Sequence, residues 1–187
     1  MARYNRRYRH FDEPWDAHEL TFSCFRRRAF LARDRTRRYV ADAVAMARDK
    51  HAFDVWAYVL MPEHVHLLIW PREETYSISG ISKSIKQSVS RKAIGWLRAE
   101  NPSGLGVLAT GQRSCPYRFW LDGAGYDRNV RKIGTLRSVI DYIHNNPVRR
   151  GLVESPEEWC WSSFREWEYD EPGLIPIDKE SCLRSLQ

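Results

Sequence analysis

Hydrophobic and polar residues follow two different periods along the chain, and these periods predict a series of strands and helices. Strands are indicated where β-branched and aromatic residues cluster with alternate side chains apolar. Three strands are predicted in this way, at residues 18–25, 53–60 and 64–70. Helices are indicated where apolar residues recur every three to four positions. Three helices are predicted: from Asp34, the expected N-cap, to about Lys50; from Ser77 to about Ala99; and from Thr135 to Asn146, just before Pro147.

The rest of the chain completes the order of elements. Residues 101–116 contain Gly, Ser and Pro and are predicted as a loop, and residues 117–131 as a strand interrupted at 122–125. The strands at 53–60 and 64–70 form a hairpin. This order fits an α+β fold, the ferredoxin-like split βαβ sandwich, in which helices pack on an antiparallel sheet. The fold hosts many functions and by itself specifies none.

Composition narrows the class of protein. A chain of 187 residues is long enough for one domain with its own core. The four cysteines are scattered without a Cys-x-x-Cys pair, which argues against a zinc site or a disulfide framework. Neither a membrane span nor a signal peptide is indicated, so we expect a cytoplasmic protein without a membrane partner. The 30 Lys and Arg residues against 24 acidic ones give a net charge of +6, which favours a polyanionic partner.

The segment MPEHVHLLIW, residues 61–70, places two histidines in one predicted strand. Because strand side chains alternate between faces, His64, His66 and Leu68 lie on the same face. Two neutral imidazoles side by side can bind one divalent metal ion. The alternative is a pair of hydrogen-bonded histidines on a half-exposed sheet face. Glu63 is either an acceptor that tunes such a site or a polar residue of the hairpin turn, and the turn is the preferred explanation.

A second candidate segment is YIHNNPVRRGLV, residues 142–153. On a helix, Tyr142 and Asn146 lie one turn apart on the same side, whereas His144 does not share that side. Taken alone, Tyr142 is explained by ordinary helix packing. Beside a two-histidine metal site, Asn146 could complete the coordination and the Tyr142 hydroxyl could attack a phosphate held by the ion. Ionising a tyrosine at neutral pH costs on the order of 4 kcal/mol, which a metal ion would help to offset.

Four segments together resemble a known family: MPEHVHLLIW, YDRNVR, DYIHNNPVRRGLV and WCWSSF. Their order and spacing are similar to those of the REP-associated tyrosine transposases, the single-tyrosine branch of the HUH endonucleases, from the first strand to about Phe164. The resemblance implies that His64 and His66 bind Mg²⁺ or Mn²⁺, with Asn146 as the third ligand. It also implies that Tyr142 attacks single-stranded DNA, which yields a 5′-phosphotyrosine and a free 3′-OH.

The same resemblance sets the expected organisation and partners. It implies one HUH tyrosine transposase domain at residues 1–168, beginning with a basic arm at 1–16, and a tail at 169–187 without an assigned role. The expected partner is single-stranded DNA with hairpins, in a cytoplasmic, nucleoid-associated setting, and a homodimer is left open. Basic side chains are expected to contact phosphates. The candidates are Lys83, Lys86, Arg128 and Arg131.

Two other functions are left open by the residues. One is a catalytically silent protein that binds hairpin DNA on the same fold, although a binding protein has no need of Tyr142 and both histidines. The other is a metal-dependent phosphodiesterase that uses water as its nucleophile and therefore forms no covalent adduct with DNA. The segment FWLDGAGYDRN has more glycines than the family pattern, which leaves the course of the last strand open.

Overall fold

The computed structural model describes residues 12–123 and 125–185, and these contain a four-stranded sheet in the order β2-β3-β1-β4. Every pair of neighbouring strands is antiparallel. The strands are β1 (Ala17–Ser23), β2 (Phe53–Leu60), β3 (His64–Pro71) and β4 (Tyr126–Val130). This strand order confirms the predicted ferredoxin-like α+β fold. Residues 1–11 of the predicted basic arm lie outside the described residues.

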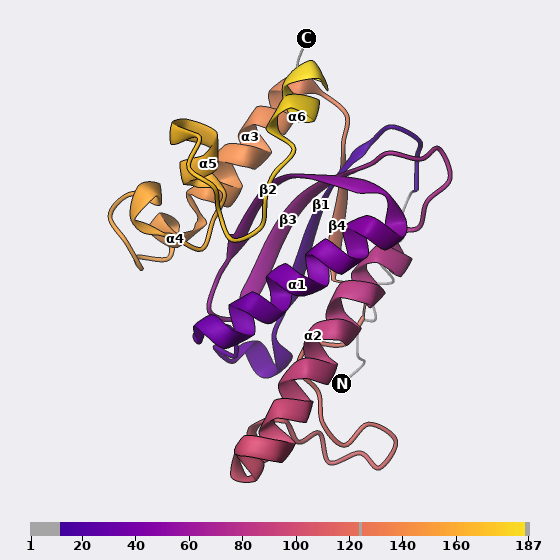
Figure 1. Cartoon of the computed structure of the whole chain (residues 1–187), viewed down its shortest axis with the longest axis vertical. Helices are drawn as coiled ribbons and strands as arrows, with labels where there is room; N and C mark the ends of the chain where they lie inside the picture. Colours follow the sequence, from indigo (N-terminus) through magenta and orange to yellow (C-terminus); the bar gives the residue numbers. More distant parts are fainter. Residues whose placement is uncertain (1–11, 124, 186–187) are drawn as a thin grey trace, which may run out of the picture.

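Helices pack on both faces of the sheet (Figure 1). α1 (Asp34–His51) and α2 (Ile78–Glu100) run side by side across one face, and α3 (Ile133–His144) packs on the other. The shorter elements are η1 (Phe25–Arg27), η2 (Pro102–Leu108), α4 (Asn146–Arg149), η3 (Pro156–Glu158), α5 (Phe164–Tyr169) and α6 (Lys179–Ser185). Within 12–123 and 125–185, no helix is long and apolar enough to cross a membrane.

The two faces of β3 bury different side chains. Val65, Leu67 and Ile69 are fully buried in the larger hydrophobic core, which lies under α1 and α2. Leu68 points the other way, into a smaller core that includes Val139 of α3. His64 and His66 share the face of Leu68, so the histidine pair lies on the α3 side of the sheet.

The ends of two predicted helices need small corrections. Arg33 is the N-cap of α1, and Asp34 is the first helical residue, where its negative charge favours the helix dipole. α3 ends at His144 rather than at Asn146. Pro147 has no N–H with which to continue the helical hydrogen bonds, and it lies instead in the first turn of α4, where no such donor is needed.

The strand predicted at 117–131 is interrupted as expected. Trp120 forms an isolated bridge with Cys24, and β4 begins only at Tyr126. Gly125 accounts for the interruption, since its φ is +90° and a Cβ there would collide with the carbonyl oxygen of Thr21. Only glycine allows this backbone to approach β1 so closely.

The residues after 168 pack against the fold. The hydroxyl of Tyr58 on β2 accepts a hydrogen bond from the Ile175 N–H at 3.2 Å. The Asp178 carboxylate accepts bonds from the backbone N–H of Val55 at 2.9 Å and from the Arg48 guanidinium at 2.8 Å. These contacts cover β2, which is an edge strand of the sheet. The division of the chain at residue 168 stays a prediction.

Candidate active site

Strand register places polar side chains next to one another across β3, β1 and β4. His66 on β3 lies opposite Thr21 on β1, and Thr21 lies opposite Tyr126 on β4. In the next row, Glu19 on β1 lies opposite Arg128 on β4. Residues directly opposite or two apart share a face of the sheet, so all five side chains lie on the α3 side.

The two histidines of β3 are adjacent and neutral. Their ring centroids are 4.9 Å apart, with the rings nearly perpendicular at 83°. Burial, and secondarily the neighbouring His64, lower the pKa of His66 to about 3. Burial also lowers the pKa of His64, although the Glu63 carboxylate acts in the opposite direction. Both imidazoles are therefore uncharged at neutral pH, which is the form that binds metal ions.

Both nitrogens of His66 have polar neighbours. Nδ1 lies 3.0 Å from the Thr21 hydroxyl and 3.9 Å from the Glu19 carboxylate. Nε2 lies 3.2 Å from the Asn146 side-chain nitrogen. If Nδ1 donates to the Thr21 hydroxyl, the lone pair of the ring lies on Nε2, where it accepts a hydrogen bond from the Asn146 amide. Burial raises the pKa of Glu19, while the Arg128 guanidinium, at 2.9 Å, opposes this shift.

Tyr142 reaches the same place from α3. Its ring centroid lies 5.5 Å from that of His66, at an angle of 87°. The side chain is 37% exposed. The guanidinium of Arg149 lies over the ring, 4.9 Å from its centroid. Asn146 reaches His66 although α3 has already ended, because Asn145 keeps a near-helical backbone with φ −82° and ψ 0°.

His144 lies apart from this group, as its position on the helix predicts. It is buried and its Nε2 lies 2.9 Å from the Ser163 hydroxyl. Burial lowers its pKa to about 4. The structure therefore brings together the four residues predicted as the catalytic and metal-binding group, and keeps the remaining histidine of that segment separate. Their chemical roles stay predictions.

The donor set of the site suits a divalent ion. Among residues 12–123 and 125–185, no three His, Cys, Asp or Glu side chains form a group that could hold a metal ion. The Asn146 carboxamide is in contact with His66, and hydrogen bonding to the same group raises the pKa of His64. A flip of the carboxamide turns its oxygen toward the histidines. Two neutral imidazoles and an amide oxygen can together coordinate a divalent metal ion.

Glu63 contacts the site in addition to forming part of the hairpin turn. Its Oε1 lies 3.3 Å from Nδ1 of His64 and accepts a hydrogen bond from Arg150 at 2.8 Å. The turn alone was the preferred explanation for this residue, and the structure adds the contact with His64. Glu63 is therefore well placed to hold the His64 ring in one orientation.

Two hollows meet at the histidine pair. One, of about 390 Å³, is lined by Glu19, Thr21, His66, Tyr126, Arg128 and Tyr142. The other, of about 430 Å³, is lined by Thr21, Ser23, Arg27, Ala29, Glu63, His64, His66 and Arg150. Thr21 and His66 belong to both. An extended ligand can therefore cross the site from one hollow to the other.

Known proteins resemble this chain in sequence and in fold. A family model described as "Transposase IS200 like" matches residues 17–103, which include both histidines of β3. A Haemophilus influenzae protein, provisionally named a REP-associated tyrosine transposase, is 28% identical over 72% of this chain and 76% of its own length. The REP-associated tyrosine transposase of Escherichia coli K12 is 26% identical over 73% of this chain and 68% of its own length. The chain is therefore similar to the IS200-like transposases and to these two REP-associated tyrosine transposases.

This relationship confirms both the resemblance and the prediction of a transposase enzyme. A solved structure, described as a REP-associated tyrosine transposase bound to a REP hairpin, superposes with a TM-score of 0.68. It is 22% identical in sequence and the match covers 91% of this chain and 88% of that one. At this level of identity the match shows the fold.

The four predicted phosphate contacts lie in different places. Arg128 pairs with Glu19 and lines the first hollow, the one that includes Tyr142 and is called the Tyr142 hollow below. Arg131 pairs with Asp16 at 2.7 Å. Lys83 and Lys86 belong to α2 on the other side of the sheet, where the Lys86 amine donates to the Gly123 carbonyl at 2.6 Å. Their contacts with DNA stay predictions.

Sequence reasoning missed Glu19 and Thr21 as neighbours of His66. The sequence does indicate their position, because Glu19 and Thr21 alternate with the apolar residues of β1. They therefore form a polar face on a strand that pairs on both sides. Arg149 and Arg150 were also missed as contacts of the site. The helical spacing of apolar residues does not identify these two arginines as contacts of the site, since α4 begins after that spacing has ended in α3.

Proposed function

We propose that this transposase cuts and rejoins single-stranded DNA through a covalent intermediate on Tyr142, with a divalent ion bound by His64, His66 and Asn146. One observation carries the proposal: the Tyr142 ring is 5.5 Å from the His66 ring, so its hydroxyl can reach a phosphate beside the histidines. The partial exposure of Tyr142 leaves room for an approaching strand. When bound, Mg²⁺ or Mn²⁺ would polarise the scissile phosphate and offset negative charge in the transition state.

The covalent step balances without a cofactor that carries energy. The Tyr142 oxygen forms a bond to phosphorus while the bond from phosphorus to the 3′ oxygen of the preceding nucleotide breaks. The phenol loses its proton and the leaving oxygen gains one, so the products are a 5′-phosphotyrosine and a free 3′-OH. The Arg149 guanidinium lies over the Tyr142 ring, 4.9 Å from its centroid, and brings a positive charge to the place of attack. The new ester keeps the energy of the broken one for rejoining.

The two hollows suggest a direction for the strand. In an in-line displacement the leaving oxygen lies opposite the attacking one. Tyr142 lines only the first hollow, so we infer that the released 3′ end occupies the second, which Arg27 and Arg150 line. The nucleotide that stays attached to Tyr142 would then lie beside Arg128.

Hairpin-bearing DNA is the proposed substrate. Both sequence relatives are named as REP-associated, and the solved relative is described as bound to a REP hairpin. The basic net charge of the chain and the arginines around both hollows support a nucleic-acid partner.

A denaturing gel tests this function. We expect the protein, incubated with single-stranded hairpin DNA and Mn²⁺, to form a covalent adduct that is lost with Tyr142→Phe, with His64→Ala or His66→Ala, and after chelation. Tyr169→Phe, which removes a hydroxyl from an exposed tyrosine bonded to Glu157, serves as the matched control and should keep the adduct.

The same gel separates the alternatives. Cleavage without an adduct would indicate a phosphodiesterase that uses water. Neither cleavage nor an adduct, in a wild type that shifts the same DNA on a native gel, would indicate a silent DNA-binding protein. Cleavage that survives chelation and both histidine substitutions would mean that the histidines are structural.

A further inference from the structure

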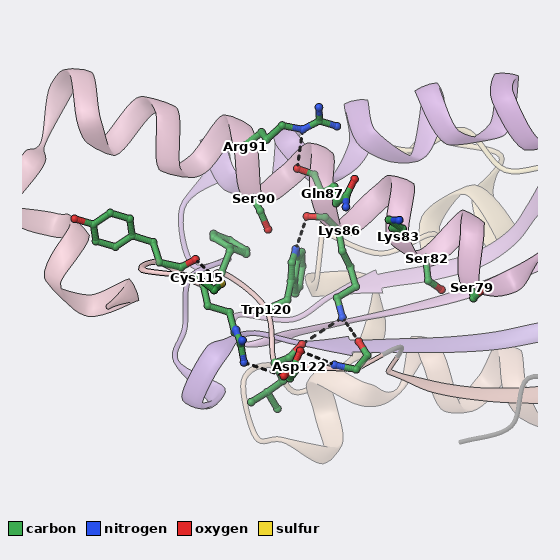
Figure 2. A pocket seen from close by; sticks show the side chains of 15 residues that line it. Ser79, Ser82, Lys83, Lys86, Gln87, Ser90, Arg91, Cys115, Trp120 and Asp122 are labelled. Atoms are coloured by element: carbon green, nitrogen blue, oxygen red, sulfur yellow. Dashed lines mark hydrogen bonds and ion pairs between the residues drawn. The ribbon is translucent and has the colours of Figure 1, made fainter. Parts of the chain in front are cut away.

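A basic groove lies on the side of the sheet away from the histidines. It has a volume of about 710 Å³ and runs between α2 and the segment 115–123 (Figure 2). Four basic side chains line it against a single acidic one, Asp122. The four are Lys83, Lys86, Arg91 and Arg118. Asp122 is paired with Arg118 at 3.2 Å, so the groove keeps an excess of positive charge.

Hydrogen bonds fix the two walls of the groove to each other. The Lys86 amine on α2 donates to the carbonyl oxygens of Leu121 at 3.3 Å and Gly123 at 2.6 Å. In return, Nε1 of Trp120 donates to the backbone carbonyl of Lys86 at 3.1 Å. Figure 2 shows these bonds between the helix and the opposite segment. The groove is therefore formed before any ligand binds, and Lys86 has a structural role in it.

Three other side chains of the groove, those of Lys83, Arg91 and Ser82, have no partner outside their own helix among the described residues. Lys83 is exposed and has no hydrogen bond or ion pair within residues 12–123 and 125–185. In the part of the chain that the structure describes, Arg91 donates only to the carbonyl oxygen of Gln87 in its own helix, at 3.4 Å. Ser82 is 2% exposed, and its hydroxyl oxygen is buried without a hydrogen-bond partner among the described residues. A buried hydroxyl without a partner is uncommon in folded proteins.

We propose that this groove binds the sugar-phosphate backbone of the DNA substrate, at a segment outside the scissile one. The inference rests on the proposed function. Small and basic residues recur along one side of α2 from Ser79 to Arg91, a length of about 18 Å, which matches several consecutive phosphates. The serines Ser79 and Ser90 leave room for a backbone to approach the helix. Phe119 and Trp120 are buried, so the groove favours contacts to phosphates over stacking with bases.

The groove and the active site are joined around the β4 edge of the sheet. Gly123 lines the groove, and Tyr126, three residues later, lines the Tyr142 hollow. Three residues of extended chain span at most about 11 Å. A DNA strand that leaves the Tyr142 hollow can therefore turn around this edge and reach α2 within a few nucleotides.

Equilibrium binding of two DNAs tests the proposal. The double variant Lys83→Gln, Arg91→Gln should bind a long hairpin-bearing strand about tenfold more weakly than wild type at low salt. The slope of log affinity against log salt should fall in magnitude by about 1.4 to 1.8, because two phosphate contacts are lost. Binding of a short strand of about four nucleotides, which occupies only the active-site hollows, should not change.

A second double variant controls for net charge. Arg38→Gln, Lys50→Gln removes the same charge from exposed positions on α1 that line neither the groove nor the active-site hollows. We expect it to leave the salt slope unchanged. Equal weakening by the two double variants, or none by the first, would overturn the groove proposal while the covalent adduct still forms. Absence of the adduct in wild type would instead overturn the proposed function.

Discussion

The two faces of β3 have opposite chemistry although their residues alternate along one strand. On the α1 and α2 side, Leu67 and its neighbours two positions away are fully buried and apolar. On the α3 side, Leu68 is buried in the same way, but His64 and His66 make polar contacts instead. Helix length accounts for the difference. α2 has 23 residues, whereas α3 has 12 and ends at His144, so helices cover less of the second face.

The polar face shows that buried groups can be held by mutual contacts rather than by apolar packing. Thr21 and Asn146 each contact one nitrogen of His66, and Arg128 contacts Glu19, which is only 4% exposed. Within such a network, the loss of one group leaves its partner buried and unsatisfied. The apolar face responds to substitution through cavities instead.

The largest expected effect is on the polar face. Tyr142→Phe should lower the rate of adduct formation by roughly 10³-fold or more, because the attacking oxygen is removed. The free energy of unfolding should change by less than about 0.5 kcal/mol, since the ring remains and the side chain is partly exposed. Quantification of the adduct on a gel measures the rate, and urea unfolding of the same preparation measures the stability. A large loss of stability would instead make Tyr142 a packing residue.

The opposite result is expected on the apolar face. Leu67→Ala should lower the free energy of unfolding by about 2–5 kcal/mol, because it leaves a cavity under α1 and α2. The adduct formed per folded molecule should stay near the wild-type value. Urea unfolding measures the loss of stability, and an adduct assay normalised to the folded fraction measures the effect on chemistry. An effect on chemistry larger than that on stability would show that the faces are coupled.

A buried tyrosine on the apolar side of the sheet is expected to make the stability of the protein depend on pH. Burial raises the pKa of Tyr58 to about 12. Because the folded pKa exceeds the unfolded value near 10, this contribution to stability is fully present below pH 10 and is lost as the pH rises toward 12. The loss should be about 2–3 kcal/mol over that window. Tyr58→Phe should make this part of the curve flatter than in wild type, in urea unfolding at several pH values. Identical slopes for the two proteins would contradict the assignment.

The sequence predicted the fold and the paired histidines because both depend on local periods. The alternation in β3 places His64 beside His66, and the helical spacing places Tyr142 near Asn146. Contacts made by strand pairing could not be predicted in the same way. Thr21 and His66 are 45 positions apart, and only the register of β1 against β3 places them opposite each other. The groove on α2 likewise depends on where the segment 115–123 returns to the helix.

The smallest effect is expected from the loss of one hydroxyl, that of Thr21, on the α3 side of the sheet. Thr21→Val keeps the shape and strand propensity of the side chain but removes the oxygen that lies 3.0 Å from Nδ1 of His66. The imidazole then loses a partner that fixes its tautomer and orientation, so Mn²⁺ affinity should fall by about 10–100-fold. Thr21→Ser, which keeps the hydroxyl, should bind the ion nearly as well as wild type. Thr36→Val, which removes a hydroxyl from the start of α1, should have no effect. Titration of Mn²⁺ into the four proteins measures this, and equal affinities for the valine and serine variants at position 21 would show that the hydroxyl does not position His66.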